Sequence, residues 1–188
     1  MGLLFLQTTL DHKYNRGFTL VEMMITVVLI AIMVNLVAPM GHVAEGFKLD
    51  YVNQRIYSSA VLARSEAIKR SETVSVCRSI SGTTCQAGTN WADGWVVFVN
   101  NNGNNSIDPG EDIIRVYNPV SSPVEITWNG SIPLLSFRPR GSAVRQGIFT
   151  LCSVPKRPMV QRQVDISGSG LIRKREGVKC LLPTIPSP

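Results

Sequence analysis

The apolar positions of the chain change their spacing twice along its length. Residues 18–40 form one near-continuous apolar stretch interrupted by a single charge, Glu22. Roughly twenty apolar residues at about 1.5 Å of rise each make a helix of roughly 30 Å, enough to cross the hydrocarbon core of a bilayer. Residues 41–72 keep a helical period, but the apolar stripe is narrower. That stripe consists of Leu49, Val52, Ile56, Ala60, Ala63 and Ala67.

After residue 72 the pattern changes to period two, and Gly, Pro, Asn and Ser bound short runs of β-branched and aromatic residues. The predicted strands are Thr73–Ser79, Trp95–Asn100, Asp112–Asn118, Val124–Trp128, Leu134–Arg138, Gly147–Val154 and Val160–Ile166. One long N-terminal helix followed by short strands predicts an α+β fold with the helix packed on an antiparallel sheet. Residues 73–182 form the β-rich globular domain of this prediction, and the Pro-rich residues 183–188 form an irregular tail.

The start of the apolar stretch has an unusual order of residues. Lys13 and Arg16 precede it and favour a cytoplasmic location for that end. A carboxylate within an apolar segment costs about 2.5–3.5 kcal/mol on insertion scales, so Glu22 needs a partner. A secretory signal is cleaved after its apolar part, but here the small residue, Gly17, lies before it. Processing at Gly17 would therefore leave the apolar helix on the mature protein.

The run Arg16-Gly17-Phe18-Thr19-Leu20-Val21-Glu22 resembles the leader of type IV prepilins and type II secretion pseudopilins. The resemblance implies that prepilin peptidase removes the leader, residues 1–17, between Gly17 and Phe18, and that Phe18 is then N-methylated. It also implies that Glu22 pairs with the Phe18 amine of a neighbouring subunit during assembly. Pilins carry a proline at the position of Pro39, where the missing amide donor kinks the transmembrane and assembly helix, residues 18–40. The alternative is a plain single-pass anchor whose Glu22 lies near the membrane interface.

Further stretches are similar to the FimT/GspH branch of pilin-like proteins. They include Ala63–Arg70, Trp91–Phe98, Phe137–Gly141 and Val164–Gly170. The resemblance implies a minor pilin or pseudopilin with a type IV pilin-like fold, whose partners are other pilin subunits. It implies an inner-membrane protein with a periplasmic C-terminal domain, which later enters a pilus or pseudopilus. A pseudopilin of a type II protein secretion system and a purely structural or priming minor pilin are the alternatives.

The chain has four cysteines, Cys77, Cys85, Cys152 and Cys180, an even count that indicates disulfides in a periplasmic domain. Three pairings are possible. Cys77–Cys85 and Cys152–Cys180 are preferred, because the first closes a short loop and the second ties the last segment to a strand.

The sequence shows no metal, cofactor or catalytic motif. The cysteine spacing is not that of a zinc site, and neither histidine lies near a cysteine in the sequence. The Asn-rich segment 100–111 and Asp112 offer oxygen ligands for calcium, but the Asp-x-Asp-x-Asp-Gly order is missing, and a long hairpin turn explains the asparagines. We therefore expect no metal, no cofactor and no enzyme activity.

Charge is distributed unevenly along the chain. Residues 18–135 hold seven Lys or Arg against ten Asp or Glu, whereas residues 136–188 hold ten against two. Such asymmetry indicates a polyanionic partner, and lysine and arginine contacts with phosphates are independent of base sequence and sensitive to salt. The alternative is a solvated basic face, or one that pairs with an acidic neighbouring subunit.

The resemblance gives the basic segment a specific meaning. In FimT-type pilins of naturally transformable bacteria, a Gly-Arg-x-Arg motif takes part in binding incoming DNA. This chain has Gly170-Leu171-Ile172-Arg173, so leucine replaces the first arginine. The residues predicted to bind double-stranded DNA are Arg173, Lys174, Arg175 and Lys179, followed by Arg162, Lys156 and Arg157.

Overall fold

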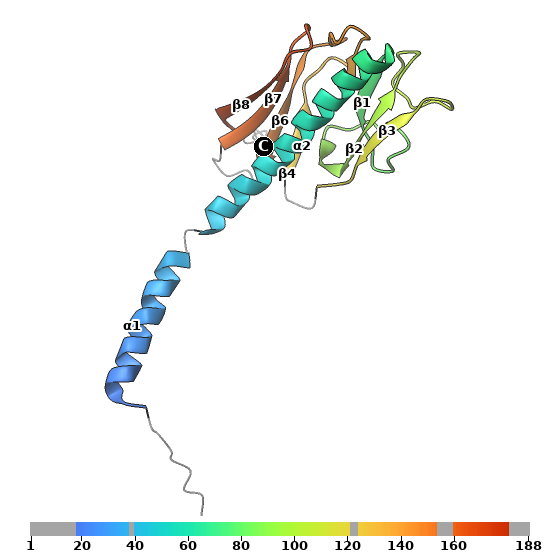
Figure 1. Ribbon diagram of the computed structural model, residues 1–188. Helices are drawn as coiled ribbons and strands as arrows, with labels where there is room; N and C mark the ends of the chain where they lie inside the picture. The colour runs from blue at the N-terminus through green and yellow to red at the C-terminus, as the bar shows by residue number, and fades with distance from the viewer. Residues whose placement is uncertain (1–17, 38–39, 121–123, 154–159, 181–188) are drawn as a thin grey trace, which may run out of the picture. The chain divides into compact units, whose positions relative to one another are not determined.

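The computed structural model describes residues 18–37, 40–120, 124–153 and 160–180 (Figure 1). The chain divides into two compact units, Met1–Gly41 and His42–Pro188. In the first unit, helix α1 (Leu20–Val37) begins after Thr19, whose hydroxyl accepts a hydrogen bond from the Glu22 amide at 3.2 Å. No helix within the described residues is both long enough and apolar enough to cross a membrane.

Helix α2 (Met40–Arg70), which belongs to the second unit from His42 onwards, packs on two four-stranded antiparallel sheets. The first sheet has the order β3-β2-β1-β5, built from β1 (Val74–Arg78), β2 (Trp95–Val99), β3 (Ile113–Tyr117) and β5 (Leu134–Phe137). The second has the order β4-β6-β7-β8, built from β4 (Val124–Trp128), β6 (Gly147–Ser153), β7 (Val160–Ile166) and β8 (Ile172–Lys179). A short 3-10 helix, η1 (Trp91–Asp93), precedes β2. The predicted α+β fold is confirmed.

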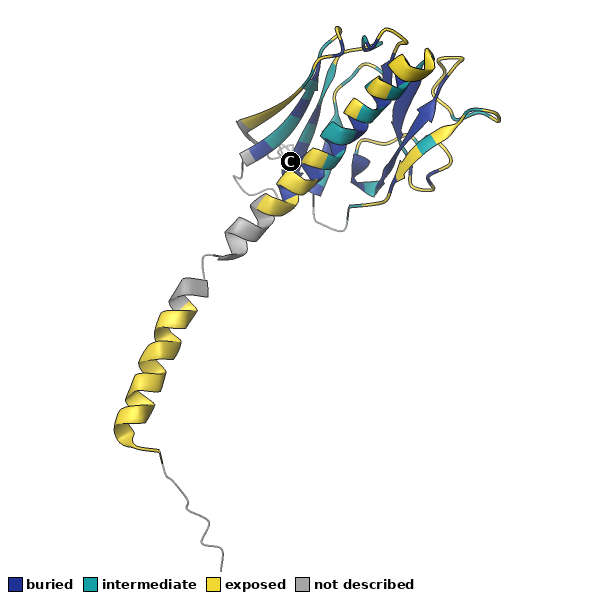
Figure 2. Cartoon of the chain, in the orientation of Figure 1, coloured by how far each residue is buried: buried dark blue, intermediate teal, exposed yellow. Residues whose placement is uncertain are grey.

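One continuous core joins α2 to both sheets. The predicted stripe of α2 is buried along its whole length, and Figure 2 shows the buried residues along the side of α2 that faces the strands. The three alanines of this stripe are fully buried, and their small side chains allow the helix axis to lie close to the sheets. Beneath the helix, Phe149 contacts Trp91 and Trp128 with ring centroids 4.9 and 4.5 Å apart.

All seven predicted strands are present, with ends within two residues of those predicted. Strand β8 was missed, because Ile172–Lys179 carries four basic residues and one glutamate and lacks the alternation of a half-buried strand. Its pairing with β7 over six register positions forms a hairpin and supplies the order that the local sequence does not encode.

Candidate assembly and nucleic-acid-binding sites

The predicted assembly site lies at the start of α1. Gly17 and Pro39 lie outside the described residues, whereas Phe18 is 77% exposed and Glu22 stands exposed in the first helical turn. A carboxylate in the first turn interacts favourably with the helix dipole. Every residue from 18 to 34 is exposed, as the yellow ribbon of α1 in Figure 2 shows, and most of these residues are large and apolar. An apolar helix of this kind needs a membrane or other subunits to cover it.

The predicted DNA-binding residues of β8 do not share one face. Side chains alternate along a strand, so Ile172, Lys174 and Glu176 point to one side of the sheet, and Arg173 and Arg175 point to the other. Ile172 packs against the core, and the Lys174 ammonium contacts the Gln54 side chain of α2 and lies 4.9 Å from the centroid of the Tyr57 ring. The basic run is therefore divided between the face that meets α2 and the outer face of the sheet.

Two of the predicted phosphate ligands already have carboxylate partners. The Arg162 guanidinium donates to Asp50 at 2.6 Å, lies 3.8 Å from Glu176, and is 14% exposed. The hydrogen bond to Asp50 raises the pKa of Arg162 above its ordinary value, against the opposing effect of burial. Arg175 forms an ion pair with Asp165 at 2.8 Å. These contacts compete with any phosphate. Lys156, Arg157 and the side chain of Lys179 lie outside the described part of the chain.

Three of the stretches that resemble the FimT/GspH branch meet at one junction. The Nε of Arg64 on α2 donates to the Gly141 carbonyl oxygen at 2.9 Å. A Cβ atom on Gly170, whose φ is +84°, would lie 1.9 Å from the same oxygen. The loop after β5 therefore packs directly on the β7–β8 turn. Arg140, in the loop after β5, and Arg173, near the start of β8, are exposed and form no ion pair with a described carboxylate.

The Asn-rich loop between β2 and β3 supplies hydrogen-bond donors to its own carboxylates. The side-chain amides of Asn102 and Asn104 each donate to Asp108 Oδ2 at 2.6 Å. Glu111 accepts backbone hydrogen bonds at 3.0 Å from Asn101 and Asp108. Amide donors therefore stand where a cation would otherwise bind. Within the described ranges, no three His, Cys, Asp or Glu residues gather in a position to hold a metal ion.

The structure contains both disulfides that the sequence favoured. Cys77 and Cys85 are joined across a Cα–Cα distance of 5.6 Å, and Cys152 and Cys180 across 6.0 Å. The second bridge joins β6 to the residue after β8 and bypasses β7, so it fixes the end of the edge strand.

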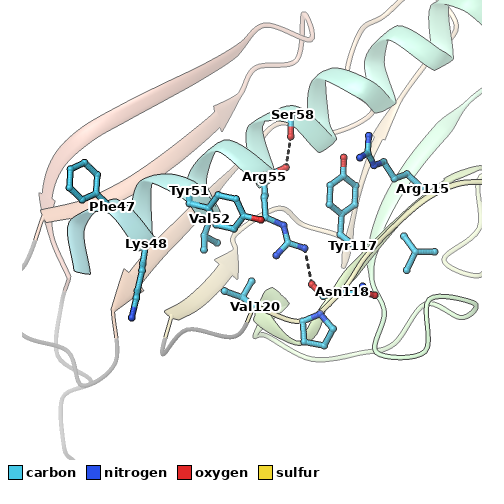
Figure 3. A pocket seen from close by; sticks show the side chains of 12 residues that line it. Phe47, Lys48, Tyr51, Val52, Arg55, Ser58, Arg115, Tyr117, Asn118 and Val120 are labelled. Atoms are coloured by element: carbon cyan, nitrogen blue, oxygen red, sulfur yellow. Dashed lines mark hydrogen bonds between the residues drawn. The ribbon is translucent and has the colours of Figure 1, made fainter. Parts of the chain in front are cut away.

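Sequence reasoning missed a groove beside α2, where the side chains of Arg55, Tyr51 and Tyr117 come together (Figure 3). Arg55 and its hydrogen-bond partner Asn118 are 63 positions apart, and no local motif links them. The only signal in the sequence was an arginine and aromatic residues in polar surroundings, which is common on protein surfaces.

An N-terminal apolar helix, followed by a helix packed on antiparallel sheets and closed by disulfides, defines the class of type IV pilin-like proteins. A family model described as Type II transport protein GspH matches residues 53–170, and one described as Prokaryotic N-terminal methylation motif matches residues 12–34. The chain belongs to the GspH family of structural pilins and pseudopilins. The methylation motif indicates a membrane-anchored component of a pilus or pseudopilus.

Individual proteins agree with this assignment. The chain is 27% identical over 166 residues to the pilin-like protein PilA1 of Thermus thermophilus, covering 85% of this chain and 91% of that protein. The minor pilin FimU of Pseudomonas aeruginosa has a similar crystal structure, with a TM-score of 0.58, 18% identity, and coverage of 73% of this chain and 98% of FimU. A second crystal form of FimU gives a TM-score of 0.54 at 17% identity, covering 70% of this chain and 99% of FimU. The likeness to FimU shows the fold alone.

Proposed function

We propose that this protein is a minor subunit of a type IV pilus, cut by prepilin peptidase between Gly17 and Phe18. The segment from residue 18 to 40 anchors it in the inner membrane with the β-rich domain in the periplasm, before it enters the filament. The observation that carries this proposal is the methylation motif at residues 12–34, which includes most of the exposed apolar helix α1. A pseudopilus of a type II secretion system is the alternative setting for the same assembly chemistry.

Glu22 has a defined role in this proposal. It is a charge in an otherwise apolar helix, and its carboxylate pairs with the methylated amine of Phe18 on a neighbouring subunit. Glu22→Ala should leave the protein in the membrane and exclude it from sheared filaments. Immunoblots of the membrane and filament fractions measure this, with Glu72→Ala, outside α1, as the control. Normal incorporation of Glu22→Ala would show that the carboxylate is merely tolerated.

A second candidate function is non-specific binding of double-stranded DNA by the filament during natural transformation. It is favoured by the junction of Gly141 with Gly170, which packs the loop that carries Arg140 on the turn that precedes Arg173 of β8. Both arginines are exposed, and neither forms an ion pair with a described carboxylate. Of the residues predicted from sequence, Arg173 is therefore the first candidate, Lys174 the second, and the carboxylate-paired Arg162 and Arg175 the weakest. Several subunits on one filament would add their weak contacts.

A gel shift with the purified full chain tests this second function. Arg140→Ala and Arg173→Ala should each weaken binding of duplex DNA and reduce the slope of log affinity against log salt by about one. Arg115→Ala removes the same charge from the other sheet and should leave the slope unchanged. If the double variant at Arg140 and Arg173 binds as well as the parent, the DNA site is wrong, and the structural subunit remains.

A further inference from the structure

A groove of about 790 Å³ lies between one side of α2 and the segment that runs from the end of β3 towards β4 (Figure 3). Six residues of α2 line one wall, and residues 115–120 line the other. The six are Phe47, Lys48, Tyr51, Val52, Arg55 and Ser58. Strand β3 is an edge strand of the first sheet, so the outer side of its backbone has no neighbouring strand within the described chain. Backbone groups on such an edge can pair with an added extended segment.

Aromatic rings hold a guanidinium group in this groove. The Cζ atom of Arg55 lies 4.9 Å from the ring centroid of Trp95 and 5.9 Å from those of Tyr51 and Tyr117. One of its terminal nitrogens donates to the Asn118 carbonyl oxygen at 2.8 Å, so the group has a fixed orientation. A guanidinium that stacks on rings keeps donors available at its edge.

The positive charge of the groove is not balanced by the described chain. Lys48, Arg55 and Arg115 line it, and no aspartate or glutamate does. None of the three forms an ion pair with a described carboxylate, whereas four arginines elsewhere in the unit each have a carboxylate within 3.1 Å. Those four are Arg70, Arg78, Arg162 and Arg175. The groove therefore offers its cations to an anionic group of another molecule.

Large apolar side chains surround these cations. Phe47 is 69% exposed, Tyr51 is 64% exposed, and Val116 is 46% exposed. A ligand that fits must therefore bury apolar surface beside the group that carries its negative charge. An aspartate or glutamate next to an aromatic or aliphatic residue combines both properties. Duplex DNA does not, because its outer surface presents phosphates and sugars, and Arg55 as a residue is only partly exposed.

We propose that this groove binds an extended, acidic segment of a neighbouring filament subunit, with its carboxylate on Arg55 and Arg115 and an adjacent apolar side chain against Tyr51 and Val116. The assignment of this segment to another filament subunit rests on the proposed function, whereas the preference of the groove for an acidic, apolar peptide does not. Binding here would give the protein a specific neighbour at the level of the globular domains, in addition to contacts of the apolar helices.

The chemistry is tested on the purified full chain in detergent by fluorescence anisotropy. The probe is a labelled peptide with phenylalanine between two glutamates, compared with a matched peptide that has glutamine in place of both glutamates. The glutamate peptide should bind more tightly, and Lys48→Gln/Arg115→Gln should weaken it about tenfold. Arg145→Gln, an exposed arginine outside the groove, should have no effect. Equal binding of the two peptides, or unchanged binding to the double variant, would overturn the proposal.

The neighbour is tested in filaments from living cells, with a photo-crosslinking amino acid in place of Val116. The expected adduct joins this protein to another filament subunit through a peptide that contains aspartate or glutamate, and Lys48→Gln/Arg115→Gln reduces its yield. An adduct with DNA, an adduct that the double variant leaves unchanged, or no adduct in filaments that contain the protein would contradict it. Absence of the protein from filaments would instead contradict the proposed function. The peptide measurement would still show whether the groove binds an acidic segment.

Discussion

Gly170 packs so closely on the Gly141 carbonyl oxygen that no side chain fits between them. Its φ of +84° is also one that residues with a Cβ rarely adopt. The same oxygen accepts a hydrogen bond from Arg64, so a single backbone atom connects α2, the loop after β5 and the β7–β8 turn. This connection joins three segments that are far apart in the sequence.

Gly170→Ala should therefore destabilise the protein by more than about 2 kcal/mol, because the left-handed dihedral and the backbone clash both act on it. Gly168→Ala is the matched control, since a Cβ there meets nothing within 4 Å. Thermal unfolding of the two full-length variants measures the difference. Similar melting temperatures for both variants would contradict the prediction, because they would show that the close packing of Gly170 on the Gly141 carbonyl oxygen is not needed for stability.

At the scale of elements, the sequence predicted what periodicity encodes and missed what only contacts between distant segments create. The stripe of α2 and the strands such as Val124–Trp128 and Val160–Ile166 have local patterns, and the structure contains them. Strand β8 has no such pattern and depends on β7. Because β8 pairs with β7 as a strand, the side chains of Lys174 and Arg173 lie on opposite faces of the sheet. The carboxylate partner of Arg162 lies 112 positions away in the sequence. Neither arrangement was visible in the sequence.

The end of α2 supplies a pH-dependent prediction. The side-chain hydrogen bond from Arg70 holds the pKa of Glu66 below its ordinary value of 4.5, although burial acts in the opposite direction. A lowered pKa means that the ionised carboxylate stabilises the fold above the ordinary value, and that this contribution is lost as the pH falls through the lowered pKa. Glu66→Gln should therefore lower the melting temperature at pH 7 and have little effect at the acid end of the range.

The Arg70→Gln background serves as the control for this titration. Without the Arg70 donor, the effect of Glu66→Gln on the melting temperature at pH 7 should shrink, because the largest cause of the lowered pKa is gone. An effect of Glu66→Gln that stays the same at all pH values, or that is unchanged in the Arg70→Gln background, would contradict the assignment.

The Cys152–Cys180 bridge should stabilise the edge strand β8 in particular. The two cysteines are 28 positions apart. In the chain-entropy model, a disulfide that closes a loop of this length lowers the entropy of the unfolded chain and raises the free energy of unfolding by about 3.5 kcal/mol. Cys152→Ala/Cys180→Ala should lower overall stability and increase hydrogen exchange in β8 more than in β1. Cys77→Ala/Cys85→Ala, across 8 positions, should cost less and leave exchange in β8 unchanged. The reverse ranking would show that β8 does not depend on its bridge.

At the scale of the whole molecule, the chain combines an apolar helix whose described residues 18–34 are exposed and a folded unit with a continuous core. A membrane can cover the first before assembly, and neighbouring subunits can do so afterwards. The folded unit then presents two distinct basic surfaces, the arginines at the Gly141–Gly170 junction and the groove around Arg55. In our proposals the first binds phosphates and the second binds an acidic segment of a neighbouring subunit.

The assignment of this protein as a processed filament subunit depends most on where the mature chain begins. Mass spectrometry of the protein purified from cells that contain prepilin peptidase should find an N-terminal peptide that starts at N-methylated Phe18. A peptidase-deficient strain should retain residues 1–17. A mature chain that starts after the apolar stretch, or one that keeps residues 1–17 in the presence of the peptidase, would contradict the assignment of this protein as a processed filament subunit.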